Sequence, residues 1–118
     1  MADEWNINVT FASPATVGVP RTINLNYPGD DLGGMSWTVH FSDTGAGGTY
    51  NPPTALMGDP SSGSPTSVQT QYTPAAPGNV FFDFWEDVAI FSFVYTPPFL
   101  VVQAGFDPKK SAAFMQFF

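Results

Sequence analysis

The chain has 118 residues with three basic and ten acidic side chains, which gives a formal net charge of −7. Nucleic-acid phosphates are bound by clustered Lys and Arg, so this composition excludes nucleic acid as a partner. The sequence contains no cysteine, which excludes disulfides and zinc–thiolate sites. Apolar residues make up 43% of the chain, enough for the core of one domain, which must stabilise the fold unaided.

Three segments of the first third alternate between large apolar and polar side chains. They are residues 5–11, 22–27 and 35–41, separated by turn-rich stretches. A period of two residues is typical of strands with one buried face. Trp37 lies at the centre of the third segment, where sandwich domains bury a Trp, and His40 falls on the opposite, outer face.

The middle of the chain, residues 42–67, is rich in Gly, Pro, Ser and Thr and has few large apolar residues. This composition predicts at most one short edge strand, with loop elsewhere.

The second half again predicts strands, over residues 68–72, 80–85, 88–95 and 99–103. In the second of these, Val80, Phe82 and Phe84 form the inner set. In the third, both alternating sets are apolar, and we expect the set Val88, Ile90, Ser92 and Val94 to face the core. The sequence therefore predicts an all-β, antiparallel sandwich of seven to eight strands over residues 1–105.

The last residues, 106–118, are predicted to form a separate docking tail, as a short helix or an irregular segment. Asp107 is a suitable N-cap and Pro108 suits the first helical position. The apolar side chains of the tail are expected to contact a partner, because an isolated apolar chain end frays in water. The longest apolar run, 88–102, is interrupted by prolines and shorter than the roughly 20 residues of a membrane span, so no membrane partner is expected.

Three short motifs of turn and core residues also bear on the fold. Residues 13–23, Ser-Pro-Ala-Thr-Val-Gly-Val-Pro-Arg-Thr-Ile, look like the opening of bacterial and phage immunoglobulin-like domains. Tyr72-Thr73-Pro74 with Gly78, and the run Thr96-Pro97-Pro98-Phe99 with the apolar residues after it, are similar to patterns of filamin-type repeats. The segment 88–95 and the tail depart from that pattern. These are turn and core motifs, so the resemblance implies a fold and no particular ligand.

No catalytic constellation can be named from the sequence. His40 is the single histidine, and no Ser or Asp beside it forms a recognisable motif. Acidic residues cluster at 30–31, 43 and 83–87 and could offer oxygen ligands to calcium, but their spacing matches no EF-hand loop. We expect solvated loop charges there, and no metal or cofactor.

Aromatic residues make up 16% of the chain, more than one thin core holds easily. Some are therefore expected at the surface, where they would contact a partner protein or stack on sugar rings. The alternative is that the tail or the central loop covers them. The candidate partner-binding residues are Trp5, Trp85, Phe91, Phe93, Tyr95, Phe114, Met115, Phe117 and Phe118.

These features favour a non-enzymatic accessory protein, a decoration or tail-associated protein on the surface of a phage or virus particle. Its partner would be the capsid or tail, or further copies of itself in a homo-oligomer. The alternative is a carbohydrate-binding or adhesin domain of a larger extracellular bacterial protein, with Trp5, Trp85 or Tyr95 as stacking platforms. A small enzyme is a third hypothesis, for which the sequence offers no nucleophile, base and oxyanion hole.

Overall fold

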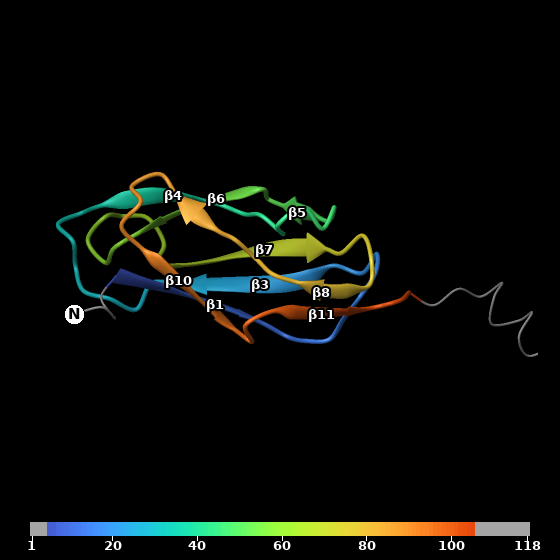
Figure 1. Cartoon of the computed structure of the whole chain (residues 1–118). Helices are drawn as coiled ribbons and strands as arrows, with labels where there is room; N and C mark the ends of the chain where they lie inside the picture. The colour runs from blue at the N-terminus through green and yellow to red at the C-terminus, as the bar shows by residue number, and fades with distance from the viewer. Residues whose placement is uncertain (1–4, 106–118) are drawn as a thin grey trace, which may run out of the picture.

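The computed structural model describes residues 5–105, and residues 1–4 and 106–118 lie outside the described part. It contains eleven strands in three sheets, which confirms the predicted all-β class and is consistent with a β-sandwich (Figure 1). Over residues 5–105, no helix is long and apolar enough to cross a membrane. The strands are β1 (Asn6–Phe11), β2 (Ala15–Thr16), β3 (Arg21–Asn26), β4 (Ser36–His40), β5 (Thr49–Asn51), β6 (Thr54–Gly58), β7 (Ser67–Thr73), β8 (Gly78–Val80), β9 (Trp85–Glu86), β10 (Ser92–Thr96) and β11 (Leu100–Gln103).

The largest sheet has five strands in the order β10-β1-β3-β7-β5. A three-stranded sheet, β6-β4-β9, belongs to the opposite layer, and in Figure 1 β4 and β6 lie above β1, β3 and β7. The third sheet, β2-β11-β8, lies toward the end of the molecule from which the chain leaves β11. The two layers bury the apolar set of each alternating strand between them.

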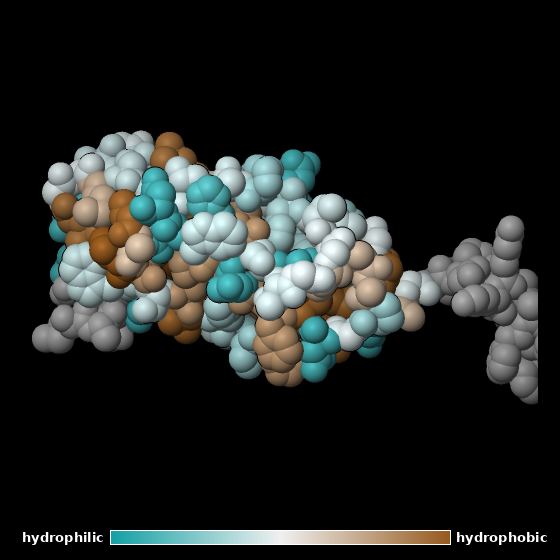
Figure 2. All heavy atoms as spheres, turned by 45° about the horizontal axis from the view of Figure 1, so that its top comes forward, coloured by the Kyte–Doolittle hydropathy of each residue, from teal (hydrophilic) through white to brown (hydrophobic). Residues whose placement is uncertain are grey.

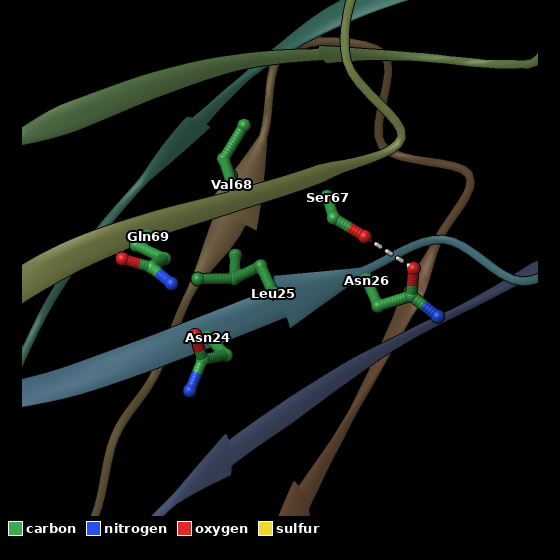
Figure 3. A pocket seen from close by; sticks show the side chains of 6 residues that line it. All are labelled: Asn24, Leu25, Asn26, Ser67, Val68 and Gln69. Carbon is green, nitrogen blue, oxygen red and sulfur yellow. Dashed lines mark hydrogen bonds between the residues drawn. The ribbon is translucent and has the colours of Figure 1, made fainter.

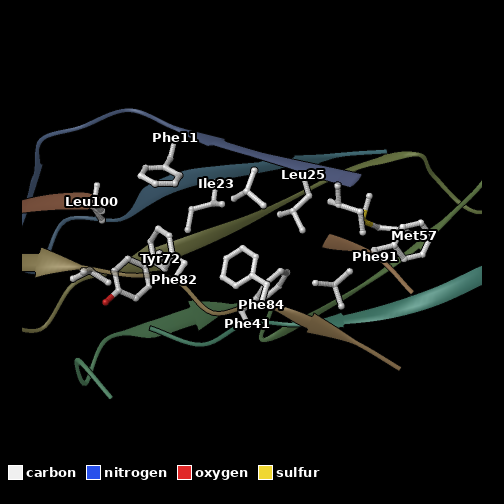
Figure 4. Close-up of a cluster of buried hydrophobic side chains, with 14 of the residues drawn as sticks. Phe11, Ile23, Leu25, Phe41, Met57, Tyr72, Phe82, Phe84, Phe91 and Leu100 are labelled. Carbon is white, nitrogen blue, oxygen red and sulfur yellow. The ribbon is translucent and has the colours of Figure 1, made fainter. Parts of the chain in front are cut away.

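The core contains large side chains from every sheet (Figure 4). Trp37 is 1% exposed, as predicted, and its ring meets Tyr27 edge to face at 5.4 Å. The most completely buried apolar residues are Ile7, Val9, Ile23, Leu25, Trp37, Val39, Met57, Tyr72 and Leu100. Burial of each such side chain contributes roughly 1.5–3 kcal/mol. These strands are therefore stabilised because their alternation places apolar side chains on the face that packs in the core.

The middle of the chain was predicted wrongly. Instead of at most one edge strand, it forms β5, which pairs with β7, and β6, which pairs with β4 along its whole length. Met57 is fully buried opposite Trp37. One anchoring side chain and the hydrogen bonds of β4 are enough to hold a strand that has little strand propensity of its own.

Strand pairing is antiparallel, as predicted, in six of the eight pairings among the described residues. The exceptions are β1 with β10 and β2 with β11, which are parallel. Both join strands from opposite ends of the sequence, where no tight turn dictates an antiparallel arrangement.

Residues 80–85 do not form the single continuous strand that was predicted. Val80, Phe82 and Phe84 are buried, as expected, but β8 ends at Val80 and β9 begins at Trp85. The intervening residues cross from the sheet of β8 to that of β9, and Figure 1 shows this segment as a diagonal. The alternation continues through the crossing because Phe82 and Phe84 fill the space between the layers.

The inner and outer faces of residues 88–95 are the reverse of the prediction. Phe91 is only 9% exposed and Phe93 and Tyr95 are half-buried, whereas Ile90 and Val94 are 40% and 43% exposed. The pairing of β10 with β1 places Phe93 opposite Ile7 and Tyr95 opposite Val9. The parallel register therefore turns the aromatic set toward the core, and a shift of one residue would turn it outward.

Candidate binding site

A hollow of about 330 Å³ opens where strands β9 and β10 come near each other. Each is the last strand of its sheet, so the two layers separate there without a further strand to close the gap. The residues that line the hollow are Phe84, Trp85, Glu86, Ala89, Phe91 and Phe93. This is a mainly aromatic lining with a single carboxylate.

The position of the carboxylate follows from the pairing of β9 with β4. Glu86 is paired with Val39, and Trp85 with His40. Paired residues share a face of a sheet, and Val39 is fully buried, so Glu86 faces the interior and Trp85 faces outward. Glu86 is 5% exposed and Trp85 is 51% exposed.

Glu86 is therefore a buried acidic group in an apolar setting. Its Oε1 atom is buried and accepts no hydrogen bond from any residue in the range 5–105. Removing a carboxylate oxygen from water without a replacement donor costs free energy. The neighbouring Asp87 is bonded: Thr38 N–H donates to Asp87 Oδ1 at 3.0 Å, and Asp87 N–H donates to the Thr38 carbonyl at 3.2 Å.

Trp85 forms the outer rim of the hollow. One face of its indole stacks on His40, with ring centroids 5.3 Å apart and planes 11° apart. His40 is half-buried on the outer face of β4, as predicted, and the described part of the chain gives it no hydrogen-bond partner. The same residues contain no group of three or more acidic or histidine side chains that could hold a metal ion.

The walls of the hollow belong to a connected set of aromatic rings. Phe93 meets Phe84 edge to face at 6.0 Å, and Phe91 lies 4.3 Å from Trp37, centroid to centroid. The Tyr95 hydroxyl accepts a 2.8 Å hydrogen bond from the Phe84 N–H. Burial raises the pKa of Tyr95, so its phenol stays neutral at physiological pH. These contacts fix the walls in place.

The structure brings together three of the predicted site residues, Trp85, Phe91 and Phe93. Trp85 is exposed and Phe93 is half-buried, but Phe91 is only 9% exposed, so the prediction that Phe91 lies exposed on the outer face is wrong. Trp5 is 38% exposed and its ring centroid lies 6.4 Å from that of Phe91. Tyr95 lies deeper, against Phe84. Phe114, Met115, Phe117 and Phe118 are outside the described residues.

Sequence reasoning missed Glu86 as a site residue and counted it among the solvated loop charges. The signal was present in the alternation, since Glu86 continues the inward set of Phe82 and Phe84. Asp43 is also buried rather than solvated, at 9% exposure. It accepts hydrogen bonds from the N–H groups of Ala46 and Gly48 and from the Tyr72 hydroxyl.

A second candidate surface is the outer face of the five-stranded sheet over β1, β3 and β7, which we call the amide face. It carries only uncharged hydrogen-bonding side chains: Asn6, Asn8, Thr10, Thr22, Asn24, Asn26, Ser67, Gln69, Gln71 and Thr73. A shallow hollow of about 460 Å³ lies over part of it (Figure 3). There the Ser67 hydroxyl and the Asn26 side-chain oxygen are 2.6 Å apart in a hydrogen bond.

Exposed apolar side chains occur elsewhere too, and Figure 2 shows them in several separate brown areas. One pair is Phe81, 54% exposed as predicted for its outer face, and Phe99, with ring centroids 5.2 Å apart. Val101, in β11, is 37% exposed.

No protein-family model, curated protein or solved structure matches this chain.

Proposed function

We propose that this chain is a non-enzymatic binding module that attaches to a larger protein assembly, as an accessory protein on the surface of a phage or virus particle. The observation that carries the binding role is the hollow between β9 and β10, where aromatic rings surround a buried carboxylate that has no described partner. A rigid apolar hollow with one polar group suits recognition of a protruding group. The particle as the location rests on the sequence features and on the resemblance to phage immunoglobulin-like domains.

The location is tested with an antibody raised against the purified protein. Particles from the culture that produces the protein are separated on a density gradient, and each fraction is probed. Co-migration of the protein with intact particles, resistant to washing, supports the proposal. Recovery of the protein only in particle-free fractions contradicts it.

A carbohydrate-binding role is the second candidate, and the amide face favours it. Side-chain amides and hydroxyls both donate and accept hydrogen bonds, as sugar hydroxyls do, and no charged residue interrupts this surface. Trp85 lies elsewhere and exposes half of its surface, which would allow a sugar ring to stack on it.

A glycan-binding assay with variants distinguishes sugar binding at the amide face from sugar stacking on Trp85. Binding at the amide face is expected to be lost in the variant Asn24→Ala/Gln69→Ala and to persist in Trp85→Ala. Stacking on Trp85 would give the reverse pattern and a change in Trp fluorescence. Absence of binding across a broad neutral glycan panel rejects the second role.

A further inference from the structure

We propose that the hollow between β9 and β10 receives a basic side chain, lysine or arginine, from a partner protein, with Glu86 as its counter-charge. This inference rests on the proposed binding role and names the chemistry of the partner at that site. The expected ligand is therefore a cationic group at the end of an apolar side-chain stem.

The buried carboxylate is the first argument. Glu86 is 5% exposed, lines the hollow, and has an oxygen that no residue in the range 5–105 satisfies. A buried carboxylate is normally paired with a cation or with several hydrogen-bond donors. An incoming ammonium or guanidinium group would supply both at once.

The lining is the second argument. Phe84, Phe91 and Phe93 offer apolar contact for the methylene stem of a long basic side chain. Trp85 stacks on His40 through one face of its indole and is 51% exposed, so it can lie against a cation at the rim. Aromatic faces attract cations, and Trp does so most strongly.

Size and charge also favour one basic side chain over an oligosaccharide. A volume of about 330 Å³ is at the lower end of the roughly 300–1,000 Å³ of ligand pockets, which suits one side chain. Neutral sugars would leave the carboxylate without a counter-charge. The net charge of the chain, −7, attracts basic partners over neutral or acidic ones.

Titration calorimetry on the full chain tests the inference with small probes. Nα-acetyl-lysine methylamide and Nα-acetyl-arginine methylamide represent the basic side chains, and Nα-acetyl-norleucine methylamide is the neutral match of the lysine stem. We expect at least one basic probe to bind, with a dissociation constant on the order of 1 mM for ligands of this size. The norleucine probe should bind at least tenfold more weakly.

Two variants locate the site. Glu86→Gln keeps the shape of the side chain and should weaken binding at least tenfold. Asp30→Asn removes one exposed charge that is not part of the lining of the hollow and should leave binding unchanged. Circular dichroism spectra confirm that both variants are folded. Trp85→Ala should weaken binding severalfold by removing the rim.

Four outcomes would overturn the inference. The first three are equal binding of basic and norleucine probes, equal binding by the Glu86→Gln and native proteins, and displacement of the basic probe by neutral sugars. The fourth is tighter binding of butylammonium than of both blocked amino acids, because the site would then select a small alkylammonium ion rather than a side chain carried on a peptide. Co-migration with particles tests the proposed function separately, so either result can fail alone.

Discussion

At the level of single residues, the buried carboxylates have contrasting surroundings. Asp59, at the end of β6, is fully buried and accepts hydrogen bonds from the N–H groups of Leu32, Gly34 and Met35 at 2.7–3.0 Å. Burial by itself raises the pKa of Asp59, but these backbone donors and that of Ser61 outweigh it and hold the pKa below its ordinary value of 3.8. Asp59 thus connects two loops, whereas Glu86 Oε1 accepts no such hydrogen bond from residues 5–105.

The variant Asp59→Asn should unfold at a temperature several degrees lower than the native protein at pH 7. A carboxyl group whose pKa is lower in the folded state than in the unfolded state stabilises the native state at pH values above its unfolded-state pKa. This stabilisation is lost as the pH falls through the folded-state pKa. The native protein should therefore lose stability below about pH 4, and the variant should lose less there. Thermal unfolding followed by circular dichroism from pH 7 to pH 2 measures both. Parallel pH curves would contradict the assignment.

The variant Glu86→Gln should be more stable than the native protein, by on the order of 1 kcal/mol, because it removes a buried charge that lacks a described partner. Urea unfolding at pH 7 measures the difference, and Asp30→Asn is the matched change of charge at an exposed position. A stability gain together with lost binding of a basic probe would mark Glu86 as a residue that serves recognition. A clear loss of stability would show that the carboxylate has a stabilising partner.

At the level of strands, β6 depends on a glycine. A Cβ atom on Gly58 would lie 1.9 Å from Ser62 Oγ and 2.8 Å from Ser64 Cβ, so the loop that follows β6 passes directly over this residue. The Gly58 N–H also donates to the Pro65 carbonyl at 2.9 Å. The loop can therefore close back onto β6 only where the side chain is absent.

The variant Gly58→Ala should lose about 1–3 kcal/mol of unfolding free energy, the usual cost of forcing an extra methyl group into a filled space. Thr54→Ala, on the exposed other end of β6, should change stability by no more than about 0.5 kcal/mol. Urea denaturation of both variants gives the comparison. Equal stability of the two would show that the loop moves aside at no cost.

At the level of the whole molecule, the two layers are joined by polar contacts as well as by the core. Tyr72, in β7 of the five-stranded sheet, donates from its hydroxyl to Asp43 Oδ2 at 2.8 Å. Asp43 follows β4 of the opposite layer, and Gly48 N–H donates to the same oxygen at 2.7 Å. Burial, and then the bond to Asp43, raise the pKa of Tyr72, so this phenol remains a donor across the physiological range.

The variant Tyr72→Phe should lose about 2 kcal/mol of unfolding free energy, because it breaks a buried hydrogen bond to a charged acceptor. Tyr50→Phe is the matched control, since its ring centroid lies 4.8 Å from that of Tyr72 and its buried hydroxyl has no partner among the described residues. Removing the Tyr50 hydroxyl should leave stability equal or raised. Denaturation midpoints with unchanged slopes measure both, and a larger loss in Tyr50→Phe would contradict this account.

The sequence by itself determined what is local. Alternation in residues 5–11, 22–27 and 35–41 predicted strands and their inner faces, including Trp37, because the period of two is a property of the extended backbone. It also placed Trp85 outward and Phe84 inward. The same alternation places Glu86 in the inward set with Phe84, although its burial depends on the pairing of β9 with β4.

Only the tertiary structure decided what depends on long-range pairing. In residues 88–95 both alternating sets are apolar, so composition could not choose between them, and the parallel register with β1 turned Phe93 and Tyr95 inward. The strand β6 exists because β4 supplies its hydrogen bonds. The hollow exists because two sheets end side by side, at β9 and at β10. Local sequence fixes which side chains share a face, but which face is buried is settled by the strand that pairs with it from elsewhere in the chain.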